Sequence, residues 1–229
     1  MVNLSQERYE VLDEKVEEII EYLSNKEILN KNCFQTDKFY ELHQLLSLNF
    51  NIPQTSITKV MARILFSIGY SKKPNVLVGA GTYTGNALAW LSGYSILGDA
   101  GQKTSIYGLD ISKEATAISQ INFANIHASD VHIIQADAIS WITEVPEKID
   151  LLYIDIDTKE DGKKKYLDLL HVAFPKMNEN GLIIAHDINE KKFEKDMKPF
   201  EEALLDETKF KSSINLNVDP FGLSISIKR

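Results

Sequence analysis

The chain has little cysteine, a deficit of positive charge and no long apolar run. The single cysteine among 229 residues, Cys33, excludes an internal disulfide framework and suits a reducing compartment. Acidic residues outnumber basic ones by 33 to 25, and the net charge of −8 argues against a general surface for nucleic acid or anionic lipid. No stretch approaches the roughly 20 apolar residues that cross a bilayer, and the acidic start lacks the apolar core of a signal peptide. We therefore expect a cytoplasmic protein without a nucleic-acid or membrane partner.

The first part of the chain has the apolar spacing of amphipathic helices. The expected helices are one over 5–24, a short one that includes Phe39 to Leu46, and a third that is capped by Thr55 or Ser56 and stopped by Gly69. We expect residues 1–70 to form a helical cap in the same domain as the rest. Such a cap acts as a lid, a dimer surface or a packing layer.

From Asn75 onward the pattern changes to alternating strands and helices. Continuous apolar runs predict strands at 75–79, 105–110, 131–137, 149–155 and 181–187, with helices near 85–96, 113–127, 138–143 and 163–177. This alternation is typical of a parallel, doubly wound sheet. Residues 71–229 are therefore predicted to form an α/β domain with a Rossmann-like sheet.

The end of the chain predicts an antiparallel hairpin that finishes this sheet. A charged helix near 191–208 precedes two strand-like stretches, which the sequence Asp219-Pro220-Phe221-Gly222 separates as a turn. In the last stretch, Leu223, Ile225 and Ile227 alternate with Ser224, Ser226 and Lys228, so the two sets face opposite sides. The expected fold is thus a seven-stranded, mostly parallel sheet that ends in a hairpin.

A glycine-rich turn follows the first predicted strand, in N-V-L-V-G-A-G-T-Y-T-G-N-A-L. Gly79, Gly81 and Gly85 allow a tight turn and leave room for a ligand to approach the backbone, although such turns also occur for packing. The third glycine of a dinucleotide fingerprint is Thr84 here, so a pyrophosphate fits imperfectly. A cofactor without phosphates, such as S-adenosylmethionine, fits better.

Acidic residues end the second and third predicted strands. In an open parallel sheet, ligands bind beyond the carboxyl ends of the strands. Asp110 is placed to accept hydrogen bonds from ribose hydroxyls, or else caps the helix that starts near Ser112. Asp137 is placed to accept from an adenine amino group, or else caps a helix over Ala138–Ile142. Both alternatives remain open for each residue.

The fourth and fifth predicted strands end in Asp155 and Asp187. Two carboxylates at adjacent strand ends suit a hard divalent cation, or else they are solvated loop caps. His186 precedes Asp187 at the same edge. It is either a general base, because imidazole titrates near neutrality, or a histidine bonded to the backbone.

Several of these stretches, taken in order, resemble the motifs of one enzyme family. They are Gly79–Ala87, Asp110, Ala136–Ala138, Tyr153–Thr158, Asn180–Ile188 and Phe221–Arg229. They resemble the class I S-adenosylmethionine-dependent O-methyltransferases, specifically the catechol/caffeoyl-CoA O-methyltransferase-like group. The resemblance runs from about Thr55 to Arg229, and it rests on the order and spacing of the motifs rather than on any single one.

The resemblance implies methyl transfer from S-adenosylmethionine to a hydroxyl of a small acceptor, such as a phenol, by a homodimer. The cofactor contacts that it implies are Gly79, Gly81, Tyr83, Thr84, Gly85, Asp110, Asp137, Ala138 and Asp155. In the family, the first Asp of D-A-D and a later D-N pair hold a divalent cation such as Mg²⁺. Here Asp155 and Asp187 remain, but Ile188 replaces the Asn and cannot ligate a metal. We therefore expect weak or absent metal binding, with His186 or Asp155 as the proton acceptor.

Two other functions share parts of this pattern. A nicotinamide-dependent oxidoreductase has the same glycine turn and strand-end acid, but the missing third glycine and the terminal hairpin count against it. A non-catalytic homologue that keeps the fold and binds the cofactor is the other alternative. The family's motif-one Glu is replaced by Gly79 and its Asn by Ile188, which keeps this alternative open.

Overall fold

The structure, a computed structural model, describes residues 4–30, 34–53, 56–158 and 161–229, with side chains described from residue 13 onward. Cys33 and Thr55, named above, lie outside these described residues. Within them, no helix has both the length and the apolar character needed to cross a bilayer.

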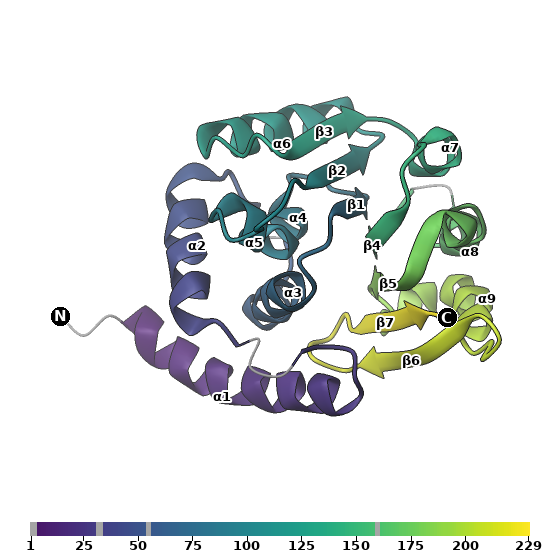
Figure 1. Ribbon diagram of the computed structural model, residues 1–229, viewed down its shortest axis with the longest axis horizontal. Helices are drawn as coiled ribbons and strands as arrows, with labels where there is room; N and C mark the ends of the chain where they lie inside the picture. Colours follow the sequence, from purple (N-terminus) through teal and green to yellow (C-terminus); the bar gives the residue numbers. More distant parts are fainter. Residues whose placement is uncertain (1–3, 31–33, 54–55, 159–160) are drawn as a thin grey trace.

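Within the described residues, the strands form one seven-stranded sheet with the order β3-β2-β1-β4-β5-β7-β6 (Figure 1). The strands are β1 (Val76–Ala80), β2 (Ser105–Asp110), β3 (Val131–Gln135), β4 (Ile149–Ile154), β5 (Met177–His186), β6 (Phe210–Leu216) and β7 (Leu223–Lys228). Strands β1 to β5 pair in parallel, while β7 is antiparallel to both β5 and β6. The predicted fold class, a mostly parallel sheet that ends in an antiparallel hairpin, is confirmed.

Helices cover both faces of the sheet, which explains why its strands are continuous apolar runs (Figure 1). One face carries α3 (Lys59–Lys72), α4 (Asn86–Leu91), α5 (Gly93–Ile96) and α6 (Lys113–Asn125), with α1 (Leu4–Asn25) and α2 (Thr36–Asn49) farther out. The other face carries α7 (Ala138–Glu144), α8 (Lys165–Ala173) and α9 (Glu194–Leu204), with the short turns η1 (Phe174–Lys176) and η2 (Lys191–Phe193). Two apolar cores result, one on each face of the sheet.

The third helix differs from its predicted form at both ends. It is capped by Thr58, whose hydroxyl oxygen accepts a hydrogen bond from the N–H of Met61 at 3.2 Å, and not by Ser56. It also continues past Gly69 to Lys72, so Gly69 is not its stop. A Cβ at Gly69 would collide with the backbone carbonyl of Leu91. This glycine therefore permits close packing of α3 against the end of α4.

Helix α3 is also buried on all sides, because every residue from Met61 to Ser71 is buried. Its apolar side chains share one core with Leu151 of β4 and Leu182 of β5. Of the three forms of the cap that we held open, the burial of α3 fits a packing layer on the sheet, and the boundary expected near residue 70 lies inside this helix.

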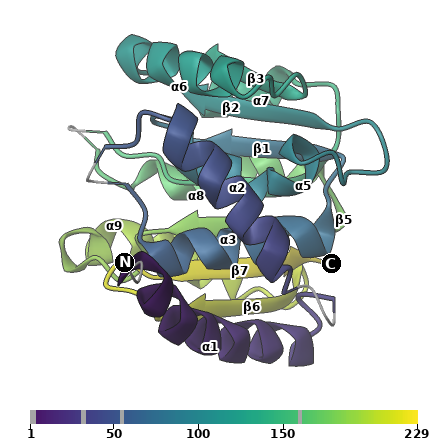
Figure 2. The same cartoon turned by 90° about the vertical axis from the view of Figure 1, so that its left-hand side faces the viewer.

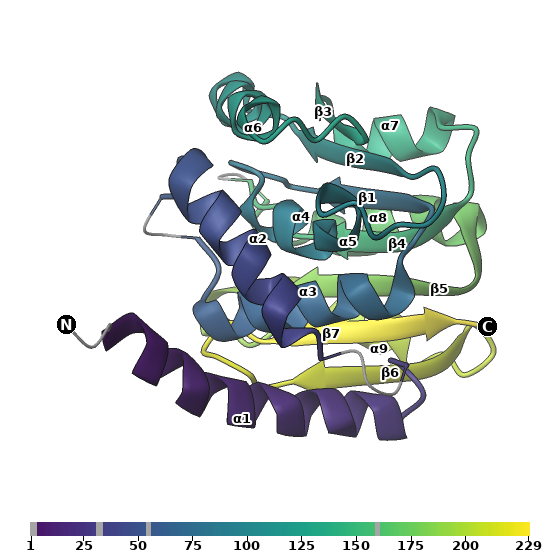
Figure 3. The same cartoon turned by 60° about the vertical axis from the view of Figure 1, so that its left-hand side comes forward.

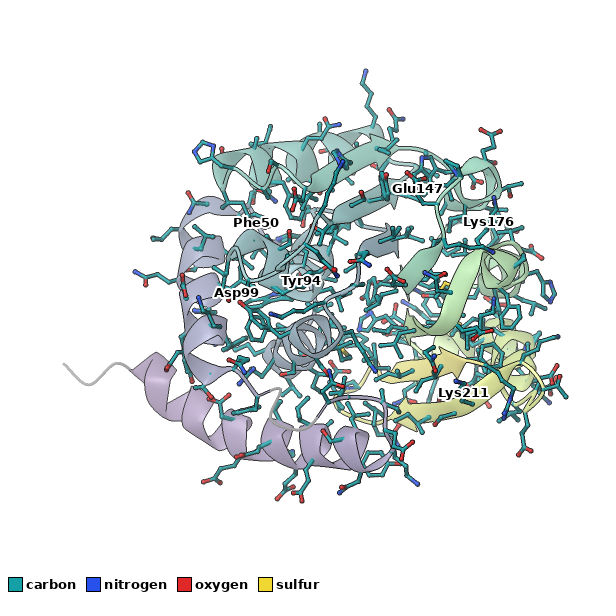
Figure 4. The ribbon with its side chains drawn as sticks, in the orientation of Figure 1. Phe50, Tyr94, Asp99, Glu147, Lys176 and Lys211 are labelled. Carbon is teal, nitrogen blue, oxygen red and sulfur yellow. The ribbon has the colours of Figure 1, made fainter. Side chains whose placement is uncertain are left out.

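The outer helices α1 and α2 are held to α3 by a buried arginine. The Nε of Arg63 lies 3.2 Å from Asp13 Oδ1 of α1, and its guanidinium lies 4.5 Å from the centre of the Phe39 ring of α2. Helix α1 runs beside α3 near the β6 edge, while α2 crosses the outer side of α3 to α5 (Figures 2 and 3). At the end of α2, Phe50 packs edge-on against Phe123 of α6, with ring centres 5.2 Å apart (Figure 4). The N-terminal helices and the sheet thus share one continuous core.

Strand β7 has the predicted alternation, but neither of its faces is open to solvent. Leu223, Ile225 and Ile227 of β7 join the core that contains α3. On the opposite side Ser224 and Ser226 are also buried, because β7 lies between β5 and β6 and helices cover both faces.

Candidate active site

The carboxyl ends of β1 to β5 surround a cavity of about 720 Å³. Gly81 and Tyr83 line it from the loop after β1, Asp110 from β2, and Asp137 and Ala138 from the loop after β3. Asp155 and Asp187 line its far end, after β4 and β5. The structure therefore brings most of the predicted cofactor residues to one cavity at the predicted edge of the sheet.

The glycine loop is shaped by packing within the protein. The N–H groups of Gly81 and Thr82 donate to the carbonyl of Leu109 at 2.9 and 3.0 Å, which ties the loop to the end of β2. Gly81 has φ +80°, and a Cβ there would collide with the backbone carbonyl of Asp155. Our interpretation that the missing Cβ makes room for a ligand is wrong for Gly81, because the backbone after β4 fills that room.

The other predicted loop residues take different positions. Gly85, at φ +89°, is the N-cap of α4, and a Cβ there would lie 2.6 Å from the Phe123 ring. Gly79 is buried within β1. Neither lines the large cavity among the described residues, whereas Thr84 lines a second one. Gly79 and Gly85 therefore serve the packing of the loop and do not line the cavity.

Asp110 joins the loops after β1 and β2. Its two carboxylate oxygens accept hydrogen bonds from the N–H groups of Tyr83 and Ser112, each at 2.8 Å. The cap of α6 is Ser112 itself, whose hydroxyl oxygen accepts from Ala115 N–H at 3.2 Å. Asp110 is thus not the helix cap that we held open as one alternative. It fixes the geometry of the cavity wall.

Asp137 is the N-cap of α7. Its Oδ1 accepts a hydrogen bond from the N–H of Ser140 at 2.8 Å, so the capping alternative is confirmed. The residue also lines the large cavity beside Ala138. A cap of this kind leaves the second carboxylate oxygen able to accept from a ligand.

A second cavity of about 360 Å³ adjoins the first. Its walls include Thr84, His186 and Phe221. The two cavities share five lining residues: Gly81, Tyr83, Asp155, Asp157 and Asp187. They therefore meet where β1, β4 and β5 end.

At this meeting point, Asp155, Lys163, His186 and Asp187 form a closed cluster, the charged ring. Lys163 Nζ lies 2.8 Å from Asp155 Oδ1 and 2.9 Å from Asp187 Oδ2. His186 Nδ1 lies 3.3 Å from Asp155 Oδ2 and 3.2 Å from Asp187 Oδ1. Neither ring nitrogen of His186 has a well-aligned hydrogen-bond partner among the described residues, so these contacts are electrostatic. All four carboxylate oxygens thus face a nitrogen.

Sequence reasoning missed Lys163. It is the first of three lysines in D-G-K-K-K, with no motif spacing that separates it from its exposed neighbour Lys164. A backward turn, in which Thr158 and Gly162 exchange backbone hydrogen bonds, brings it to the site. There its side chain is 1% exposed, and Nζ also donates to Tyr166 Oη at 3.0 Å. Only tertiary structure distinguishes this lysine from the next two.

The charges in the ring stabilise one another. Burial alone would raise the pKa of Asp155, but Lys163 and then His186 hold it well below the ordinary value. Burial would lower the pKa of Lys163 and of His186, but the two aspartates raise both. Lys163 is therefore a fixed cation at neutral pH, and His186 keeps its proton to a higher pH than a free imidazole.

The residues present do not fit a divalent cation. Asp155, His186 and Asp187 offer ligand atoms within 4.8 Å of one another. However, the Lys163 ammonium already contacts one oxygen of each carboxylate. Ile188, at the position of the third ligand that the resemblance implies, is buried in the core on the α8 face.

Part of the chain matches a known family model. Residues 78–188 match the family model described as a methyltransferase domain. The chain is similar to the ribosomal RNA large subunit methyltransferase K/L of Shewanella oneidensis, with 27% identity over 173 residues, 71% of this chain and 22% of that protein. The chain thus spans about a fifth of the length of this relative.

The fold is also shared with solved structures. The O-methyltransferase from Bacillus cereus in complex with SAH is 16% identical, with a TM-score of 0.64 over 91% of this chain and 96% of that one. A candidate caffeoyl-CoA O-methyltransferase from Staphylococcus aureus is 17% identical, with a TM-score of 0.64 over 94% of this chain and 99% of that one. The chain thus shares its fold with these solved O-methyltransferases, and residues 78–188 match a methyltransferase domain, in agreement with the resemblance.

Proposed function

We propose that the protein transfers a methyl group from S-adenosylmethionine to a hydroxyl of a small acceptor, such as a phenol. The observation that carries this proposal is the pair of adjoining cavities that meet at Asp155 and Asp187. The larger one suits the cofactor and the smaller one the acceptor. When bound, S-adenosylmethionine supplies an electrophilic methyl group for in-line displacement, while the protein supplies alignment and exclusion of water.

The cofactor cavity offers acceptors for the polar groups of an adenosine. Asp110 is held rigid by two backbone N–H groups, and each oxygen keeps a lone pair for a ribose hydroxyl. Asp137 uses Oδ1 to cap α7, and Oδ2 is placed to accept from the adenine amino group beside Ala138. At the far end, the acids Asp155, Asp157 and Asp187 favour a positively charged sulfonium.

The acceptor cavity favours a small molecule. At about 360 Å³ it lies at the lower end of the range for small-molecule sites. Its walls carry Asp157 and Glu190 as well as the two aspartates and the histidine of the charged ring, and Lys192 pairs with Glu190 at 2.7 Å. Acidic walls and a net charge of −8 disfavour the phosphates of RNA, although the curated relative acts on ribosomal RNA by name.

The proton of the acceptor hydroxyl is taken up within the charged ring. His186 is 6% exposed and lines the acceptor cavity. Only the neutral form of His186 accepts a proton. The aspartates raise the pKa of His186, so this neutral form becomes abundant only at a pH above the ordinary histidine pKa. Asp155 and Asp187 orient the imidazole. A homodimer, in which the N-terminal helices shape the acceptor cavity, belongs to the same proposal.

Calorimetry with S-adenosylmethionine and, separately, with NADH tests the cofactor. We expect binding of S-adenosylmethionine only, and a loss of about 1–3 kcal/mol of binding free energy in Asp110→Ala, which removes a charged hydrogen-bond acceptor. Glu114→Ala is the matched control, because Glu114 is an exposed acid in the first turn of α6. Preferential binding of NADH would replace the proposal with the oxidoreductase alternative.

A methyl-transfer assay with radiolabelled cofactor tests the acceptor. Its arms are a panel of phenols and other small alcohols, ribosomal RNA, and no acceptor. We expect label in a small-molecule arm only. Label in RNA would contradict the small-acceptor proposal. Cofactor binding without label in any arm would favour the non-catalytic homologue.

A further inference from the structure

The Lys163 ammonium has the surroundings of a bound hard cation. Its three N–H groups each have an oxygen partner, namely Asp155 Oδ1 at 2.8 Å, Asp187 Oδ2 at 2.9 Å and Tyr166 Oη at 3.0 Å. Tyr166 Oη in turn lies 3.3 Å from the backbone carbonyls of Ile154 and His186. The side chain is 1% exposed, so these contacts are made away from bulk water.

A divalent cation between the same carboxylates would compete with this ammonium. The two oxygens that Lys163 leaves, Asp155 Oδ2 and Asp187 Oδ1, both face His186 Nδ1. A metal ion there would lie a few ångström from the fixed positive charge of Lys163, and both cations would have to share the same two carboxylates. Two such ligands leave most of the six or more oxygen positions of a hard cation unfilled.

We propose that Lys163 takes the place of a divalent cation in this site. Its ammonium holds Asp155 and Asp187 together where the cavities meet, and it excludes metal from them. All of its N–H groups are used within the protein, so it does not reach an acceptor and is a positioning residue. The acceptor is then oriented without metal by the remaining oxygens of Asp155 and Asp187 and by His186. This part of the inference rests on the proposed function, whereas the exclusion of metal does not.

Titration with Mn²⁺, followed by its electron paramagnetic resonance signal, tests the exclusion directly. The wild type and the matched control Lys164→Ala are expected to bind no Mn²⁺ at the ring, since Lys164 is exposed and is not part of the ring. Lys163→Ala is expected to gain a Mn²⁺ site with affinity about a hundredfold higher or more, because a unit charge a few ångström away is removed. Adding Asp187→Asn to Lys163→Ala is expected to abolish the new site.

Two results would overturn the proposal. One is a Mn²⁺ site in the wild type that Asp187→Asn removes. The other is a folded Lys163→Ala protein that gains no Mn²⁺ site, which would show that the lysine is not what excludes metal. If Lys163→Ala does not fold, Lys163→Gln replaces it, because it removes the charge but keeps a hydrogen-bonding side chain, with the same two outcomes.

A failure of the proposed function gives a different result. A protein that binds no S-adenosylmethionine but gains Mn²⁺ in Lys163→Ala would lose the methyl-transfer proposal and keep the metal exclusion. In an active protein, wild-type turnover is expected to be unchanged by excess chelator. Loss of turnover with chelator and its return with Mg²⁺ would contradict the replacement of metal by Lys163.

Discussion

Replacing Lys163 by Met removes a buried charge and keeps a side chain of similar length. Removal of one partner from a buried ion pair costs about 3–5 kcal/mol, because the other charge is left uncompensated. Two carboxylates are left here, but their side chains are 25% and 18% exposed and both keep the contact with His186, so we expect the lower end, about 3 kcal/mol. For a chain of this size that loss lowers the thermal midpoint by about 6–12 °C.

The loss of unfolding free energy caused by Lys163→Met is expected to depend on pH. In the wild type, Lys163 and His186 hold the pKa of Asp155 well below its ordinary value, against the effect of burial. A carboxyl with a lowered pKa contributes stability above its unfolded pKa of about 4 and loses it as the pH falls through the folded pKa. The stability difference between wild type and variant is therefore largest near pH 6 and shrinks below about pH 4.

Urea unfolding followed by circular dichroism, at pH 6 and at stepwise lower pH, measures this difference. Lys164→Met is the matched control and is expected to change stability by less than about 0.5 kcal/mol, as for an exposed residue. A loss below about 1 kcal/mol at pH 6, the size expected for a surface ion pair, would refute the reasoning. So would a loss that stays constant on acidification, because the carboxylates would then not be its source.

Three further predictions concern the loop, the base and the N-terminal helices. Gly81→Ala combines backbone strain at φ +80° with a collision against the Asp155 carbonyl, so it is expected to lower the free energy of unfolding in urea by about 2–4 kcal/mol. Gly98→Ala, at φ +76° with open space around it, has only the strain and is expected to lower it by about 1 kcal/mol. The methyl-transfer rate is expected to keep rising as the pH passes the ordinary histidine pKa of 6.5, because the aspartates raise the pKa of His186. In His186→Ala this rise with pH is expected to disappear. A wild-type rate that stays constant between about pH 6 and 8 would exclude the imidazole as the base. A chain that starts at Ser71 lacks the buried helix α3 and is expected to be insoluble or unfolded by circular dichroism, so a soluble, active product would contradict the shared core. The predicted homodimer is checked by sedimentation velocity of the full chain.

The strands were predictable because their signal is local. Apolar runs bounded by turn residues marked all five parallel strands within a few residues, and the alternation from Leu223 to Lys228 marked the last one. The third helix was less predictable. Gly69 is a helix stop by its local chemistry, and only the approach of Leu91 explains a glycine inside the helix. The complete burial of this helix was not predictable either, since it depends on the sheet.

The acidic part of the site was predictable from topology, because parallel strands bring their carboxyl ends to one edge. Asp110, Asp137, Asp155 and Asp187 all lie there as expected. The cation that organises two of them was not predictable. The chain reverses direction between Thr158 and Gly162, and no turn motif in the sequence predicts this reversal. Two further lysines directly follow Lys163, so nothing in the sequence singles it out. A buried charge is recognisable only by its partners, and the sequence does not show that Asp155 and Asp187, which follow different strands, meet at this lysine.

The position of β7 between β5 and β6 has a consequence for synthesis. The ribosome delivers β5 before β6 and β7, so the hydrogen-bonding edge of β5 has no partner until residues 223–228 have emerged. An unpaired strand edge attracts other chains, and pairing that waits for distant segments is slow. The nascent chain therefore carries an unpaired, aggregation-prone edge from the synthesis of His186 until β7 has emerged, which is the last part of its translation.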